Sequence, residues 1–254
     1  MTERNYSVEA LVIASFPYKE ADRIVTIFSR ERGKLRVLAK GALKGKSSLR
    51  GFCQPPRHCR LALVQGRGSL DILTQGEMIE PFLGLHNALL PIAYSHYISE
   101  LLNAGLPEGK VAEPVFYLAL AAYTLLEFGN DSALALRFFQ LRYLALLGFA
   151  PNLSLCVHCG RRTVGADFVL SPARGGLLCA SCAMASESAL PLLSPGTVKT
   201  MQILAEGDLR LLSNLRISAA THAQMGPAIE NYLDYHLDYS AKARNFLQQL
   251  LAEQ

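Results

Sequence analysis

The residues best suited to chemistry in this chain of 254 residues are four cysteines arranged as two C-x-x-C pairs, Cys156 with Cys159 and Cys179 with Cys182. Each pair closes a tight turn that can place two thiolates at neighbouring corners of a tetrahedron, so together they form a four-sulfur shell suited to Zn²⁺. Such a shell leaves no open coordination position, and we therefore expect a structural zinc finger that activates no water. The alternative, a dithiol redox pair, lacks the βαβ context of thioredoxin-like proteins.

Basic residues are concentrated at the amino-terminal end. Residues 1–60 contain 13 Lys and Arg against 5 Asp and Glu, whereas the whole chain has a formal net charge of +4. Such an excess repels itself unless a polyanion binds to it, so nucleic acid is the expected ligand. A solvated basic face without a ligand is the alternative. The residues predicted to bind DNA are Arg30, Arg32, Lys34, Arg36, Lys40, Lys44, Lys46 and Arg50.

The segment from Gly41 to Ser47 resembles a nucleotide-binding P-loop, but it has three residues between its glycines where that motif has four. Pro55 and Pro56 follow soon after it, and a P-loop leads instead into a helix. We therefore expect a flexible loop that contacts DNA phosphates. Motifs of metalloproteases, serine hydrolases and zinc deaminases are also missing from the sequence, so no enzymatic activity is predicted.

Short runs rich in β-branched and aliphatic residues must position this basic cluster. They cover residues 8–16, 23–29, 34–40, 60–65 and 70–74. Five short antiparallel strands at this spacing favour a small barrel of the OB-fold type. In the third run, the alternation of a strand places Leu35, Val37 and Ala39 inside the barrel and the basic residues outside it. The two remaining cysteines, Cys53 and Cys59, are interpreted as buried or free thiols.

Helical periodicity begins after the strands, over residues 87–105, 112–129, 131–148 and 194–206, with one or two further helices in 221–252. The predicted protein is α+β and multidomain. It comprises a DNA-binding OB-fold barrel (1–80), a helical bundle (81–150), an inserted zinc finger (151–187) and carboxy-terminal helices that complete the helical domain (188–254). No apolar run approaches the roughly 20 residues that span a bilayer, and the cysteine usage is typical of a reducing compartment. A cytoplasmic protein without membrane contact is expected.

Several stretches resemble the RecO family of recombination mediators. They are RVLAKGA at 36–42, SLRG at 48–51, Gln54-Pro55 and LALRFFQLRYLALLG at 134–148, followed by the four-cysteine finger. The order of parts covers nearly the whole chain. The resemblance implies that the protein binds single-stranded DNA, anneals complementary strands and, with RecR, helps RecA to replace single-strand-binding protein (SSB). A nucleoid-associated, non-enzymatic role follows from it.

The same resemblance implies a contact with the acidic tail of SSB, for which Arg137 and Arg142 are the candidates, although both could be ordinary surface arginines. The aromatic candidates for stacking on DNA bases are Phe16, Tyr18, Phe28 and Phe52. For Phe28, a position inside the barrel is the alternative. A zinc-ribbon transcription factor or RNA-binding factor is the alternative function.

Overall fold

A computed structural model describes residues 5–66, 68–163, 165–183, 190–207, 212, 215–237 and 242–252. The chain divides into two compact units. Unit 1 contains residues 1–132 and 240–254, and unit 2 contains residues 133–239. The chain therefore leaves unit 1 after its second long helix and returns to it for its last one. The four domain limits expected from the sequence stay a prediction.

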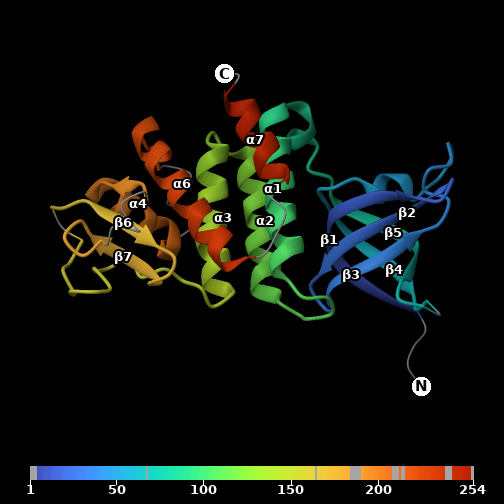
Figure 1. The fold of residues 1–254 in the computed structure, drawn as a ribbon. Helices are drawn as coiled ribbons and strands as arrows, with labels where there is room; N and C mark the ends of the chain where they lie inside the picture. The colour runs from blue at the N-terminus through green and yellow to red at the C-terminus, as the bar shows by residue number, and fades with distance from the viewer. Residues whose placement is uncertain are drawn as a thin grey trace. The chain divides into compact units, whose positions relative to one another are not determined.

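Unit 1 begins with a closed five-stranded barrel (Figure 1). Its strands are β1 (Asn5–Tyr18), β2 (Asp22–Ser29), β3 (Gly33–Ala39), β4 (Arg57–Val64) and β5 (Asp71–Glu80), and they pair in the order β1-β2-β3-β5-β4. The long strand β1 closes the barrel by pairing with both β2 and β4. The OB-like barrel is confirmed, with one difference, because β3 and β5 are parallel and only the other pairs are antiparallel.

The barrel interior follows the alternation of its strands. Val37 and Ala39 are fully buried in the core cluster and Leu35 packs against it, as the third run predicts. Cys53 and Cys59 also lie in this core as free thiols, which confirms their interpretation. The 3-10 helix η1 (Arg50–Cys53) brings Cys53 into the barrel. A P-loop leads directly into a long helix. In the described residues, segment 41–47 leads instead into the short 3-10 helix η1 and then into β4.

Helices α1 (Leu89–Gly105) and α2 (Glu113–Phe128) follow the 3-10 helix η2 (Leu83–Asn87), and α7 (Lys242–Ala252) packs along α1 (Figure 1). The Glu100 carboxylate on α1 accepts the backbone N–H groups of Lys242 and Ala243, at 2.9 and 3.0 Å. It thus satisfies free donors at the start of α7 and favours the helix dipole there. This contact holds the last helix in unit 1.

The turn between β2 and β3 contacts the segment between α1 and α2. Gly33 has a φ of 68°, and a side chain there would collide with the carbonyl of Lys110. The backbone carbonyl of Lys34 accepts the N–H of Gly109 at 2.9 Å. One end of the barrel is therefore covered by backbone from the helical part of unit 1.

Unit 2 combines helices with a small sheet. Its helices are α3 (Ser132–Leu146), α4 (Pro195–Glu206) and α6 (Ala219–His236), and only the first residue of α3 belongs to unit 1. Its sheet consists of β6 (Phe168–Ser171), β7 (Gly176–Cys179) and β8 (Leu192–Leu193), in the order β7-β6-β8. Ser194 caps α4 by accepting the N–H of Thr197, so this helix begins where the sequence predicts it. No helix in the described ranges combines the length and apolar character needed to cross a membrane.

Candidate nucleic-acid interface and metal centre

The four cysteines of the two C-x-x-C pairs come together in unit 2. The Sγ atoms of Cys156, Cys159, Cys179 and Cys182 all lie within 4.8 Å of one another. Zn–S bonds of about 2.3 Å in a tetrahedron require sulfur atoms about 3.8 Å apart, and the Sγ atoms of Cys159 and Cys179 are separated by 3.8 Å. The cluster could therefore hold a metal ion, and its sulfur donors fit zinc.

Local backbone geometry explains why this spacing works. Gly160 has a φ of 74°, and its N–H donates to the carbonyl of Cys156, which closes the first pair into a tight turn. The N–H of Cys182 donates to the carbonyl of Cys179 at 2.8 Å and closes the second pair. A hydrogen bond from the Ser181 hydroxyl lowers the pKa of the Cys179 thiol to about 6, which favours the thiolate that binds metal.

Three of the four predicted DNA-binding residues in the β2–β3 turn and on β3 have partners in ion pairs or hydrogen bonds. Arg30 pairs with Glu9 and Glu31, and Arg36 pairs with Glu108 at 3.0 Å. The side chain of Lys34 is buried, and its ammonium group donates to the carbonyl of Asn103 on α1. The outward face of β3 is thus partly occupied by helix contacts.

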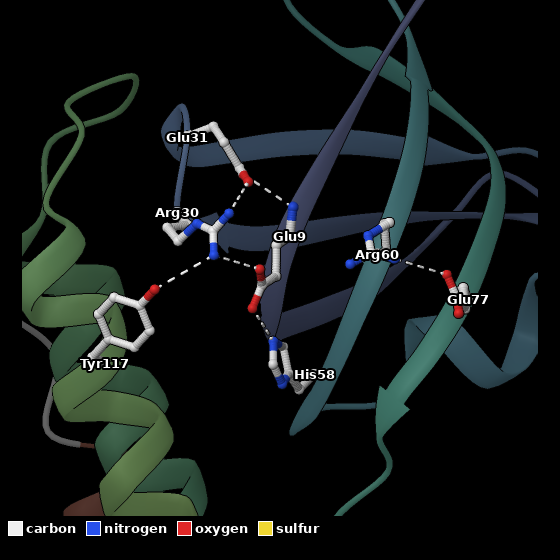
Figure 2. Close-up of polar contacts among 7 residues, drawn as sticks. All are labelled: Glu9, Arg30, Glu31, His58, Arg60, Glu77 and Tyr117. Atoms are coloured by element: carbon white, nitrogen blue, oxygen red, sulfur yellow. Dashed lines mark hydrogen bonds and ion pairs between the residues drawn. The ribbon is translucent and has the colours of Figure 1, made fainter.

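Arg30 belongs to a network that joins the barrel to α2 (Figure 2). Its guanidinium lies 2.8 Å from Glu9 on β1 and donates to the hydroxyl of Tyr117 on α2 at 3.4 Å. The other carboxylate oxygen of Glu9 lies 2.9 Å from Nε2 of His58 on β4. This network has a structural role within unit 1, because its partners are protein groups.

The remaining predicted residues are differently placed. Lys40, Lys44, Lys46 and Arg50, which we call the loop cluster, are exposed at or after the end of β3. Among the described residues, no carboxylate forms an ion pair with any of the four. Arg32 is also exposed, and its guanidinium lies 3.8 Å from the centre of the Tyr6 ring. The uncompensated charge of the barrel therefore lies mainly in the loop cluster.

The backbone of the loop cluster is fixed against the turn between β1 and β2. The N–H of Gly41 donates to the Asp22 carboxylate at 2.7 Å, and that of Leu43 donates to the carbonyl of Ala21 at 2.9 Å. The same turn carries Lys19, an exposed cation that the sequence reasoning missed. These two segments, the turn between β1 and β2 and the loop cluster, thus lie side by side at this end of the barrel.

The aromatic candidates divide between surface and core. Phe16 is 60% exposed and Tyr18 is 37% exposed, so both rings are available on the strand that leads into the turn. Phe28 is fully buried and lies 5.9 Å from the ring of Phe116 on α2, so its prediction as a base-stacking residue is wrong. Phe52 is half-buried and packs against the barrel core.

The two arginines predicted to bind the SSB tail form contacts with other residues of unit 2. Arg137 on α3 pairs with Glu230 on α6 at 3.0 Å, with side chains only 12% and 15% exposed. Arg142 donates to the backbone carbonyls of Leu204 and Gly207 at the end of α4. Both side chains hold helices of this unit together, and their role in partner binding stays a prediction.

A groove of ≈ 590 Å³ opens beside the loop cluster in unit 1. Its polar lining consists of Arg23, Arg50, Gln54, His86 and His96. The sequence reasoning missed Arg23 and the two histidines, since they are separated by up to 73 positions and belong to no local motif. They meet because η2 and α1, which carry the two histidines, fold against the barrel, whose strand β2 carries Arg23.

Comparison with known proteins decides the family. The family model described as Recombination protein O N terminal matches residues 1–82, and the one described as Recombination protein O C terminal matches residues 86–245. The chain belongs to the RecO family.

Curated RecO relatives match it along almost their whole length. The DNA repair protein RecO of Symbiobacterium thermophilum is 36% identical over 250 residues, covering 96% of this chain and 97% of the relative. That of Desulforudis audaxviator is 37% identical over 249 residues, covering 97% and 98%. The similarity to the RecO family inferred from the sequence is thereby confirmed, together with a role in DNA repair and recombination.

Proposed function

We propose that this RecO-family chain is a non-enzymatic recombination mediator that binds single-stranded DNA through the loop cluster and anneals complementary strands. The observation that carries the proposal is the set of exposed cations Lys40, Lys44, Lys46 and Arg50, which lack carboxylate partners among the described residues. Cations of this kind bind phosphates by releasing counterions. Lys19, on the neighbouring turn between β1 and β2, adds to the same positive surface.

Two further features support a single-stranded ligand. The exposed rings of Phe16 and Tyr18 lie on the strand that enters the turn beside the loop cluster, and aromatic rings stack on unpaired bases whatever their sequence. OB-fold barrels use the loop between their first two strands to bind oligonucleotides. Annealing then needs no covalent chemistry, because it requires only that the charges of two strands be screened while they pair.

The partners belong to the same proposal. With RecR, the protein helps load RecA onto DNA coated by SSB, and it acts in the cytoplasm on nucleoid DNA. The SSB tail, which is acidic, binds near Arg137 and Arg142. Arg30, Lys34 and Arg36 contribute to DNA binding less than the loop cluster does, since each already has a protein partner.

The metal at the four cysteines is Zn²⁺ in this proposal. Zinc favours a tetrahedral shell of four thiolates, and such closed sites order chain segments that have little core of their own. The site has a structural role and stabilises the finger of unit 2.

A fluorescence annealing assay with two complementary oligonucleotides tests the function. The wild-type protein should speed annealing well above the protein-free rate, and it should bind single strands without sequence preference. The K40A/K44A/K46A variant should lose most of this acceleration. No acceleration by the wild type, or binding only to one duplex sequence, would remove the mediator proposal and favour a zinc-ribbon regulator.

A further inference from the structure

The groove beside the loop cluster is lined by hydrogen-bond donors and by no acidic residue. Arg23, Arg50, His86 and His96 contribute four donor side chains, and none of the described lining residues is Asp or Glu. Its volume of ≈ 590 Å³ lies within the range of about 300–1,000 Å³ that is usual for small-ligand sites. The chemistry of the lining therefore selects an anion.

The two lining arginines keep donors for a ligand. Arg23 uses Nε and Nη2 to hold the hydroxyl and carbonyl of Ser15, at 2.7 and 3.2 Å. Arg50 uses Nη2 on the carbonyls of Leu43 and Lys44. The anchored guanidinium groups are thereby held in place, and their remaining N–H groups have no partner among the described residues. A fixed donor of this kind binds an anion with little loss of side-chain entropy.

A third guanidinium lies behind the groove. Arg57 is only 6% exposed, and its donors go to the carbonyls of Pro56 and Pro81, to Gln54 and to Nε2 of His86. None of these partners is a carboxylate, so a buried positive charge stays uncompensated next to the lining residues Gln54 and His86. Buried charges of this kind are costly unless an opposite charge lies nearby.

The contact with Arg57 also fixes the proton of His86. Since Arg57 donates to Nε2, that nitrogen accepts, and the neutral ring carries its proton on Nδ1 as a further donor. Burial and the nearby Arg57 lower the pKa of His86, which is in keeping with this neutral form. The ring adds a hydrogen bond to the groove without adding a repulsive charge beside Arg57.

We propose that this groove binds a phosphate monoester, and that its source is the phosphorylated end of a DNA strand. Three guanidinium charges without a counter-charge fit the dianion of a monoester better than the single charge of an internal phosphodiester. Arg50 and Leu43 belong both to the groove and to the segment of the loop cluster, so a strand lying on the loop cluster can place its end here. The assignment to a strand end rests on the proposed function, whereas the preference for a monoester does not.

Nuclear magnetic resonance of the histidine rings tests the monoester site without DNA. Phenyl phosphate should shift the His86 and His96 signals, assigned with H86Q and H96A, and leave the signal of the exposed His158 unchanged. Dimethyl phosphate, which carries a single charge as an internal phosphodiester does, should cause much smaller shifts at equal ionic strength. Equal shifts with both anions, or no shift of either groove histidine, would overturn the site.

Binding of eight-residue oligothymidylates that differ only at their ends tests the source. A 5′- or 3′-phosphorylated oligonucleotide should bind about tenfold more tightly than one with two hydroxyl ends, which corresponds to about 1.4 kcal/mol. H96A should remove this difference, and R60A, a change on the barrel outside the groove, should keep it. Equal affinities for all oligonucleotides would overturn the strand-end assignment and leave the proposed function intact. Thymidine monophosphate binding as tightly as the phosphorylated strand would identify a free nucleotide as the ligand, and loss of binding to every oligonucleotide would refute the proposed function instead.

Discussion

Nε2 of His58 on β4 lies 2.9 Å from Oε1 of Glu9 on β1, and the two side chains are only 7% and 17% exposed (Figure 2). The same carboxylate binds Arg30 at 2.8 Å, and Arg30 reaches Tyr117 on α2. The Glu9 carboxylate therefore links strands β1 and β4 to the turn between β2 and β3. The contact explains why Arg30, a cation in the basic cluster, is less available to DNA than its charge suggests.

Replacing Glu9 by Gln should destabilise unit 1 by about 1–3 kcal/mol, because the His58 side chain, only 7% exposed, loses its carboxylate partner. The matched control is Glu77→Gln, which removes the partner of Arg60 in a pair whose side chains are 69% and 56% exposed. That change should cost less than about 1 kcal/mol. Urea unfolding measures both, and equal losses would show that the burial of the Glu9 network has no energetic consequence.

Protein purified without a chelator should contain about one zinc ion per chain, as a closed four-cysteine shell requires. Cys179→Ser should reduce the zinc content and make the finger sensitive to protease, since metal binding orders the segment. The affinity for single-stranded DNA should stay unchanged, because the loop cluster lies in unit 1 and the finger in unit 2. Metal analysis that finds less than half an ion per chain in the wild type would contradict the site.

Arg137→Met should destabilise unit 2 by about 3–5 kcal/mol, because it leaves Glu230 without its ion-pair partner in a mostly buried position. Lys199→Met on α4, an exposed residue of the same unit, is the control and should have little effect. Chemical unfolding together with binding of an SSB tail peptide separates the two roles of Arg137. Lost peptide affinity with unchanged stability would show that this arginine serves the partner and not the fold.

The barrel should lose stability as the pH rises above about 8.5, the ordinary pKa of a thiol. Burial raises the pKa of Cys53 to about 11 and that of Cys59 to about 12, so both stay protonated in the folded barrel while the unfolded chain releases protons. This stabilisation is complete below the unfolded pKa and is lost progressively up to the folded values. The C53A/C59A variant should show a flatter decline between pH 8.5 and 10.5 in urea unfolding, and an equal slope would contradict the assignment.

Local sequence patterns predicted the elements and the clustering of the four cysteines well. The alternation in residues 34–40 places Val37 and Ala39 in the core because a strand has a period of two residues whatever surrounds it. Each C-x-x-C spacing similarly determines how its two thiols lie relative to each other, because the turn involves only neighbouring residues. Strand alternation and C-x-x-C turns depend only on residues that are close in the chain, so they can be predicted from the sequence alone.

Contacts between distant residues could not be predicted in this way. Glu9 and Arg30 are 21 positions apart, and Lys34 is buried by Asn103, 69 positions away. A count of charges in the sequence cannot show which cations form ion pairs with carboxylates or hydrogen bonds with helix backbone. The base-stacking prediction for Phe28 was wrong because α2 covers the outer face of its strand. The groove with His86 and His96 likewise depends on the packing of η2 and α1 beside the barrel.

The salt dependence of binding to a fluorescent oligothymidylate tests the central claim most directly. For single strands, the slope of log K against log salt is about −0.7 for each phosphate neutralised, so the four cations of the loop cluster predict a contribution of about −3. The K40A/K44A/K46A variant should lose about 2 units of slope along with affinity, whereas R60A should match the wild type. An unchanged slope and affinity in the triple variant would contradict the placement of DNA on the loop cluster.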